Sequence, residues 1–284
     1  MKNGDDFELL QRLNADLKMA SKLMGRDAAR GLTDFYYQIQ RFRITAANQI
    51  RQGEAGEPNK VLEWVFTSTR RLEDDINRAL GVFAAEYTVG QWLQSLTGIG
   101  NVLSAGFLSH IDVTKAPTVS HVWRFAGLDP TSKWEKKTKR PWNAALKVLC
   151  FKAADCFVKF QNHENDYYGK LYLKRKEYEA AKNQHGDYAD QAAGALAAKN
   201  FRKDTEAKKA YEDGRLPLGH IHMRAMRWTV KLFLSHLHYA MHSDYFGKPP
   251  GVPYPFEKLE GHRHFVEVPN LPFDGKGKSL RELL

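Results

Sequence analysis

Apolar residues recur at spacings of three and four along most of this chain, whereas the alternation typical of β-strands is nearly absent. The helical pattern is regular over residues 6–51 and again over residues 59–87, with the loop-forming stretch GEAGEP at residues 53–58 between them. Both segments are polar on their other faces, so we expect two helices that pack as an antiparallel, coiled-coil-like arm over residues 1–88. We expect Gly31 to divide the first segment into two helices, and the arm to drive dimerisation.

Residues 91–111 read QWLQSLTGIGNVLSAGFLSHI and combine two short apolar-faced segments with a tight turn. Gly98 and Gly100 can take positive φ and leave N–H groups uncovered at a helix N-terminus, where a phosphate is favoured. Ile99 is placed to fill the gap between the two helices. The pattern predicts a helix-hairpin-helix that grips nucleic-acid backbone through Gly98, Ile99, Gly100 and Asn101. The alternative is an ordinary turn between two packed helices.

Helical spacing continues after the hairpin, and almost to the end of the chain. Gly127 is suited to the position just after a helix C-terminus, and an interruption is expected near Gly186. The stretch HFVEV at residues 264–268 could form one short edge strand, and the proline- and glycine-rich tail is expected to wrap the core. The predicted helices span residues 117–126, 142–161, 164–213 and 216–242.

These elements predict a mainly α fold with four parts. A helical arm is followed by a helix-hairpin-helix DNA-binding domain, a helical extension and an irregular tail. The predicted boundaries are residues 1–88, 89–162, 163–246 and 247–284.

The composition favours a polyanionic partner. The chain has 284 residues and a formal net charge of +10, with a pI near 9.4. Cys150 and Cys156 lie in one apolar helical stretch and point to different sides, so we expect buried thiols rather than a disulfide. The N-terminus has no secretory signal pattern, and no apolar run is long enough to span a membrane. We therefore expect a cytoplasmic, nucleoid-associated bacterial protein.

A cationic run with two tryptophans follows the hairpin in the sequence, and Glu135 is its only acidic residue. Cations neutralise phosphates, and indole rings can stack on bases. We interpret the hairpin and this run as one continuous nucleic-acid surface; the alternative is a solvated loop whose tryptophans anchor it to the core. The candidate contact residues are Lys133, Trp134, Lys136, Lys137, Lys139, Arg140, Trp142, Asn143 and Lys147.

Residues 220–242 concentrate histidines and cations on one predicted helix. His238 and His242 share a helix face, but no acidic or cysteine partner follows at ligand spacing, so we predict no metal site. Arg224 and Arg227 begin a basic stripe that could bind nucleic acid or form a solvated face.

Two-metal nucleases need several carboxylates that converge on Mg²⁺, usually from adjacent strands. The aspartates of this chain lie on predicted helices and loops, and no set of three converges in the sequence. We predict no cofactor, with Mg²⁺ needed only if the chain has transposase activity.

Residues 92–160 resemble the C-terminal domain of DEDD-type, bridge-RNA-guided insertion-sequence transposases. The resemblance rests on SLTGIGNVLSAGFLSHID, WRFAGLDP and KRPWNAALKVLCFKAAD, at residues 95–112, 123–130 and 139–155. Asn143 and Lys147 stand where that family has the Asn and Arg of a K-x-GN-x-x-LR helix, and Trp142 replaces its glycine. The helices of residues 17–80 fit the coiled-coil arm of such enzymes.

This chain departs from the family in two respects. Those transposases begin with an RNase H-like nuclease domain, and we expect it to be absent here because the chain starts with helices. The resemblance also implies a serine nucleophile in the loop after the AGL-x-P turn. Ser132 is the only serine there, but it lies closer to the proline and is followed by Lys133 rather than glycine. It could equally be a loop hydroxyl that bonds its own backbone.

Three functions remain open from the sequence. The first is an accessory or domesticated transposase relative that binds DNA, or structured RNA, as a homo-oligomer without an enzymatic activity of its own. The second is an active transposase or recombinase subunit that uses Ser132 and carboxylates from a partner chain. The third is a structural helical oligomer whose charge serves only solubility.

Overall fold

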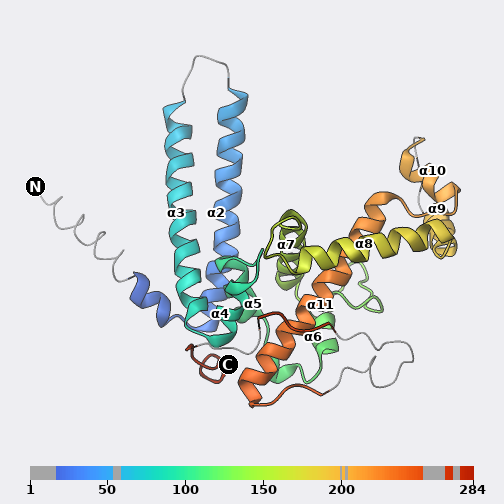
Figure 1. Ribbon diagram of the computed structural model, residues 1–284. Helices are drawn as coiled ribbons and strands as arrows, with labels where there is room; N and C mark the ends of the chain where they lie inside the picture. Colours follow the sequence, from blue (N-terminus) through green and yellow to red (C-terminus); the bar gives the residue numbers. More distant parts are fainter. Residues whose placement is uncertain (1–16, 54–58, 199, 202–203, 252–265, 271–275) are drawn as a thin grey trace, which may run out of the picture.

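The computed structural model describes residues 17–53, 59–198, 200–201, 204–251, 266–270 and 276–284, and this part of the chain is mainly helical (Figure 1). The mainly α fold predicted from the sequence is confirmed. Two short 3₁₀ turns, η1 (Val113–Lys115) and η2 (Leu280–Glu282), accompany the α-helices. The α-helices are α2 (Arg26–Gln52), α3 (Lys60–Ala85), α4 (Thr88–Ser95), α5 (Asn101–His110), α6 (Val119–Phe125), α7 (Ala144–Lys159), α8 (Tyr168–His185), α9 (Ala189–Ala198), α10 (Glu206–Glu212) and α11 (Leu218–Phe246).

Helices α2 and α3 run antiparallel and project from the body as a helical arm (Figure 1). Gly31 lies inside α2 and does not interrupt it; the chain breaks instead at residues 23–25, just before the helix. An exposed glycine costs about 1 kcal/mol relative to alanine within a helix, which a helix of 27 residues tolerates. The side chain of Asn59 caps α3 by accepting a hydrogen bond from the Leu62 N–H at 3.1 Å.

A buried carboxylate joins the two helices of the arm. Glu73 of α3 is almost fully buried and accepts hydrogen bonds from Arg43, Gln40 and Tyr36 of α2. Burial opposes its ionisation, but these hydrogen bonds hold the pKa of Glu73 below its ordinary value. Burial and the charge of Glu73 together raise the pKa of Tyr36 to about 12. The paired helices are therefore held in a fixed register at mid-arm.

Aromatic side chains from four helices meet in the centre of the body. Phe107 of α5 and Phe157 of α7 pack against Phe233 of α11 with ring centroids 5.1 and 5.4 Å apart. Tyr168 of α8 stacks on Phe157 at 4.7 Å. Helix α11, at the C-terminal end of the helical sequence, thus shares one hydrophobic core with the hairpin region.

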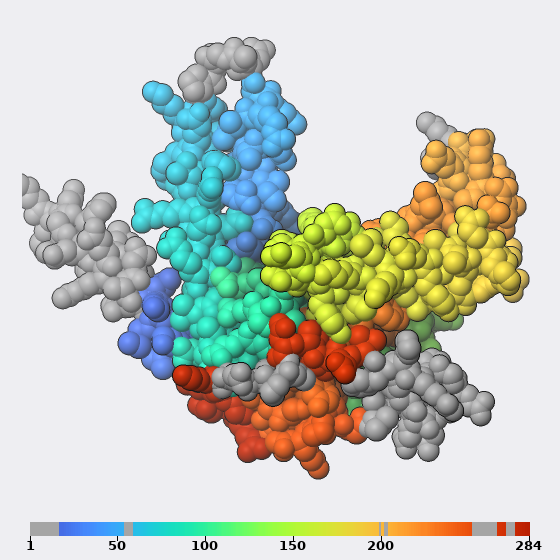
Figure 2. Space-filling view, in the orientation of Figure 1, coloured from blue at the N-terminus to red at the C-terminus, as the bar shows by residue number. Residues whose placement is uncertain are grey.

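Helix α8 extends away from the body and carries α9 and α10 at its far end, so that this projection and the arm stand on either side of the body (Figures 1 and 2). A second small core under it contains Tyr188, Tyr211 and Leu216. The interruption predicted near Gly186 is present, because Gly186 ends α8 with a φ of 93°.

The C-terminal tail lies across the body. The His236 imidazole bonds to the Val266 carbonyl at 3.0 Å, the Tyr167 hydroxyl donates to the Glu267 carbonyl at 2.6 Å, and Leu280 is fully buried. Residues 266–268 form no strand, and residues 264–265 lie outside the described residues. The predicted edge strand is therefore wrong where it can be examined, because side chains rather than a neighbouring strand bond these carbonyls.

Candidate nucleic-acid interface

The cationic run forms a loop between α6 and α7 whose two ends are fastened together. Gly127 ends α6 with a φ of 67°, and a Cβ there would lie 2.7 Å from Cγ of Trp142. The Asn143 N–H donates to the Phe125 carbonyl at 2.8 Å. Only glycine allows the indole to pack this closely, so the pattern that predicted a helix end at Gly127 also closes the loop.

The tip of the loop is ordered by contacts within itself. The Trp134 indole donates to the Thr138 carbonyl at 2.8 Å, and the Thr138 hydroxyl donates to the Glu135 carbonyl at 2.8 Å. The Arg140 guanidinium lies over the Trp134 ring, 4.9 Å from its centroid. Lys137 takes the left-handed conformation, with a φ of 73°, where the chain reverses. The loop is thus a folded turn that presents cations.

All five cations of the loop are exposed, and within the described residues none of them pairs with a carboxylate. An unpaired exposed cation is free to contact a phosphate without first breaking an ion pair. Trp134 is also 45% exposed in their midst. The five cations are Lys133, Lys136, Lys137, Lys139 and Arg140.

The start of α7 extends this surface. The Asn143 side chain caps the helix by accepting a hydrogen bond from the Leu146 N–H at 2.9 Å, and Leu146 is fully buried. Lys147 is exposed, and its ammonium lies 4.3 Å from the centroid of the half-buried Trp142 ring. The alternative reading of the tryptophans therefore applies to Trp142, which anchors the loop, and Trp134 remains available at its tip.

Helix α11 approaches the root of the loop with two cations. Lys231 lies over the Trp123 ring at 4.1 Å, and the Trp123 indole donates to the Lys231 carbonyl at 3.0 Å. Burial lowers the pKa of Lys231, while the charge of Asp129 in the loop opposes that shift. Arg227 is exposed one helical turn before Lys231 on the same face. Arg227 therefore lies toward the loop, as the predicted basic stripe requires.

Arg224 has a different role from the one predicted. Its guanidinium donates to Glu179 at 2.7 Å and to the Gln191 side chain at 3.1 Å, and lies over the Tyr188 ring. Glu179 is almost fully buried, so this arrangement fastens α8 to α11. The structure thus removes Arg224 from the candidate interface, because the contacts that occupy its charge are internal.

The predicted hairpin turn is present, although its groups are only partly available. Gly98 has a φ of 91° and is half-buried against Cys156 and Phe157, in the last turn of α7. Ile99 is buried between the helices as expected, and its N–H already donates to the Leu96 carbonyl at 3.0 Å. Ile99 is therefore removed from the predicted contact residues. Gly100 is exposed and open at the N-terminus of α5.

Asn101, the last predicted contact of the hairpin, packs inward. Its side chain accepts a hydrogen bond from Gln94 at 3.1 Å and would collide with a Cβ at Gly81 of α3. This contact joins the hairpin to the base of the arm. Gly100 is consequently the hairpin residue most open to a ligand.

The hairpin turn and the cationic loop lie at opposite ends of α7. Gly98 contacts the last turn of that helix, whereas the loop leads into its first residue, Ala144. A helix of 16 residues is about 24 Å long, at 1.5 Å per residue. The two features therefore do not form the single continuous patch that we predicted from their proximity in sequence.

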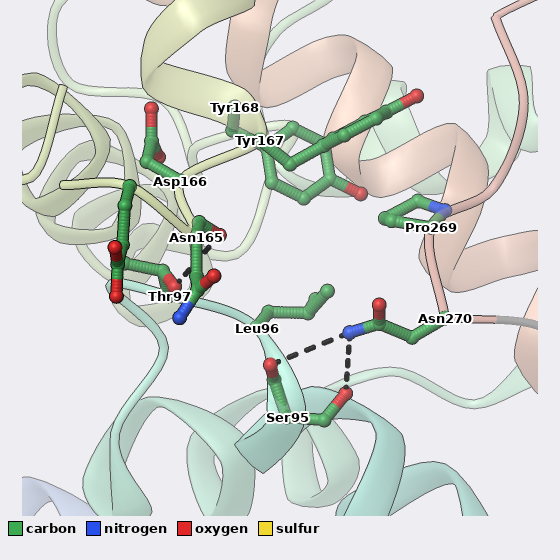
Figure 3. A pocket seen from close by; sticks show the side chains of 10 residues that line it. Ser95, Leu96, Thr97, Asn165, Asp166, Tyr167, Tyr168, Pro269 and Asn270 are labelled. Carbon is green, nitrogen blue, oxygen red and sulfur yellow. Dashed lines mark hydrogen bonds between the residues drawn. The ribbon is translucent and has the colours of Figure 1, made fainter. Parts of the chain in front are cut away.

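A small cavity beside the hairpin turn adds negative charge there (Figure 3). It has a volume of about 250 Å³, and Glu164 and Asp166 line it together with Thr97. The Thr97 hydroxyl donates to the Asn165 carbonyl at 3.0 Å, and the Asn270 amide bonds to Ser95. Carboxylates next to the turn oppose a polyanion, which leaves the loop between α6 and α7 as the better phosphate site.

Ser132 lies near the root of the cationic loop and is half-buried. Its N–H donates to the Asp129 carbonyl at 3.2 Å, but its hydroxyl has no hydrogen-bond partner among the described residues. Asp129 instead accepts from Thr131 and pairs with Arg124, contacts that hold the pKa of this carboxyl below its ordinary value. No general base is in place for Ser132 in this arrangement.

Other candidate chemistry resolves into packing. The imidazoles of His238 and His242 bond to the carbonyls of Ala116 and Lys248. No group of three or more His, Cys, Asp or Glu side chains gathers as a metal site would need in the described part of the chain. No described helix is long and apolar enough to cross a membrane.

Phe125 is a candidate contact that the sequence did not single out. It is exposed at the end of α6, and its carbonyl bonds to the far end of the cationic loop. The apolar spacing of α6 includes Phe125, and only the fold leaves it on the surface beside the loop.

A sequence model of the Transposase IS116/IS110/IS902 family matches residues 90–169 of this chain. The match runs from α4 to the first turn of α8 and so contains the hairpin turn, the cationic loop and α7. Neither the curated proteins nor the solved structures searched gave a match. This segment is thus related to a domain of insertion-sequence transposases, which supports that part of the predicted resemblance.

Proposed function

We propose that this chain is a nucleic-acid-binding protein, related to insertion-sequence transposases, that holds the backbone of DNA with the loop between α6 and α7. The observation that carries the proposal is the set of five exposed, unpaired cations on a closed and internally ordered loop around Trp134. Cations of this kind contact phosphates irrespective of sequence, and an exposed indole can stack on a base. Phe125, Lys147 and Arg227 would widen the same surface.

The relation of residues 90–169 to transposases favours DNA as the ligand. Structured RNA is the other ligand that this chemistry fits, and the two are distinguished by direct titration. The open N-terminus of α5 at Gly100 would make a second, weaker backbone contact about one helix length away. Consecutive base pairs of duplex DNA are about 3.4 Å apart, so a segment of roughly seven base pairs aligned with α7 would reach both.

Catalysis is not part of this proposal. A serine nucleophile requires a positioned base, and none accompanies Ser132 within the described residues. We propose an accessory or domesticated role in the cytoplasm, on the nucleoid of a bacterium, without a nuclease domain or bridge RNA being required for the contacts described.

The proposal is tested by reversing the charge of Lys136, Lys137, Lys139 and Arg140 to Glu in the full chain. Fluorescence anisotropy with labelled duplex DNA, single-stranded DNA and hairpin RNA should give an affinity at least about tenfold weaker than that of the unmodified chain. Removing four phosphate contacts should also flatten the plot of log affinity against log salt by up to about 3.6, at about 0.9 per contact.

A matched control reverses four exposed cations that lie away from the loop. Their reversal changes net charge by the same amount, and binding should fall far less than in the loop variant. Equal losses in the two variants, or unchanged binding in the loop variant, would exclude this loop as the binding surface. The control cations are Lys18, Lys60, Arg70 and Arg71.

A further inference from the structure

Large apolar side chains are exposed on the helical arm, although the arm packs its own two helices together. Phe42 and Trp64 are 60% and 68% exposed, and Phe35, Val61 and Leu72 are also largely exposed. Isolated exposed apolar residues need no explanation, whereas several on one face mark an interaction surface. The question is therefore whether these five side chains share a face.

The pairing of Glu73 fixes their relative positions. Arg43 and Tyr36 of α2 both bond to Glu73 of α3, so these residues face one another across the arm. Phe42 and Phe35 directly precede the first two, and Leu72 directly precedes Glu73. Successive residues are rotated by about 100°. In antiparallel helices, the residues that precede a facing pair therefore turn to the same side.

The same face continues toward the tip of the arm. Val61 lies eleven residues, or three helical turns, before Leu72 and so occupies the same stripe of α3. Trp64 follows Val61 by nearly one turn. The intervening stripe positions Gln38, Gln49 and Ser68 are uncharged, so this face combines exposed apolar groups with neutral polar ones.

We propose that this arm face is a self-association surface, on which a second copy of the chain packs its own arm. A neutral apolar face is complementary to itself, as a two-fold interface requires, and it brings no like charges into contact. A charged partner would leave its charges unpaired there. The helices concerned, of 27 and 26 residues, are long enough to form a four-helix contact with their counterparts.

The exposed area is sufficient for such a contact. A buried aromatic side chain contributes roughly 150–250 Å², so the exposed parts of the five side chains offer roughly 500 Å² per chain. Two copies would bury about 1,000 Å² of apolar surface, which reaches the minimum of about 1,000 Å² for a specific interface. Polar residues at the rim add to this area.

The test is the mass of the full-length chain in solution, measured by sedimentation equilibrium across micromolar concentrations. The unmodified chain should approach twice the 32.5 kDa of one copy. Combined replacement Phe42→Gln and Leu72→Gln should raise the dimer dissociation constant more than about tenfold. Both side chains are exposed, so circular dichroism should report an unchanged helix content and melting temperature.

Ile44→Gln is the matched control. Ile44 is 46% exposed on the same helix, but it lines the groove of about 410 Å³ between α2 and α7, on the other side of the arm. This variant should dimerise like the unmodified chain. A monomeric unmodified chain, an unaffected double variant or an equal loss in Ile44→Gln would overturn the proposal. Dimerisation that appears only after deletion of residues 2–16 would assign the face to that segment instead, and would overturn it too.

Discussion

The guanidinium of Arg140 lies over the indole ring of Trp134, while the N–H of the same indole holds the Thr138 carbonyl. A cation–π contact at an exposed site is worth about 0.5–1 kcal/mol, and together the two contacts fix the tip of the loop. The cations beside Trp134 are consequently presented in a defined geometry before any ligand arrives, which lowers the entropic cost of binding.

Replacement of Trp134 by Ala should therefore weaken nucleic-acid binding by about 1–3 kcal/mol, the contribution of one aromatic stacking contact. Trp134→Phe keeps an aromatic face but loses the N–H, so its affinity should lie between those of the unmodified chain and Trp134→Ala. Anisotropy titrations at one salt concentration measure both. If Trp134→Ala bound as tightly as the unmodified chain, the indole would be a structural part of the loop only.

Arg224 and Arg227 should separate stability from binding. Arg224→Ala leaves the buried Glu179 without one of its cations, so the free energy of unfolding should fall by about 2–4 kcal/mol. Arg227→Ala should change stability by less than about 0.5 kcal/mol and should weaken nucleic-acid binding. Urea unfolding and anisotropy on the two variants provide the comparison. A stable Arg224→Ala chain would contradict the structural role assigned to that residue.

The stability of the fold should depend on the protonation of His236. The Val266 carbonyl can only accept, so Nε2 of His236 carries the proton and Nδ1 accepts from the Tyr168 hydroxyl at 2.9 Å. Burial lowers the pKa of His236 from 6.5 to about 4. The unfolded chain therefore takes up the proton first as the pH falls. The stabilisation is complete above pH 6.5 and is lost between pH 6.5 and pH 4.

The loss attributable to His236 approaches about 3 kcal/mol when the full shift is realised. Urea unfolding at neutral and mildly acidic pH should show this decline, with a shallower pH dependence in His236→Gln. Burial also lowers the pKa of His110 and His238, so some dependence should remain in the variant. Identical slopes in the two proteins would mean that His236 titrates normally in the folded chain.

Ser132→Ala should bind nucleic acid like the unmodified chain, because the hydroxyl has no partner and the surrounding cations remain. Incubation of the unmodified chain with DNA and Mg²⁺, followed by denaturing electrophoresis, should give no covalent protein–DNA adduct. An adduct that forms with the unmodified chain and disappears in Ser132→Ala would instead establish the transposase alternative, with Ser132 as its nucleophile.

Local spacing accounts for the parts of the fold that the sequence predicted well. The helices, the turn at Gly98 and the helix end at Gly127 depend on residues within a few positions of each other, so they can be read along the chain. The strand predicted at residues 264–268 failed for the opposite reason. Its carbonyls bond to His236 and Tyr167, which are distant in sequence.

The candidate interface shows the same division. The sequence placed a hairpin and a cationic run close together, but α7 was folded between them and separates Gly98 from the loop. Phe125 could not be distinguished from a core residue, because its spacing fits a buried helix face. Exposure is decided by what packs against a side chain, and that depends on elements elsewhere in the chain.

The sequence by itself determined that this protein is helical, basic and related over one segment to insertion-sequence transposases, since periodicity, charge and motif spacing are properties of the chain order. Only the tertiary structure decided which cations stay free. Arg224 and Arg227 are one turn apart and equivalent in sequence, yet Arg224 meets Glu179, 45 residues away, and is neutralised there. Pairing across such a distance is fixed by the packing of α8 on α11, which no local pattern encodes.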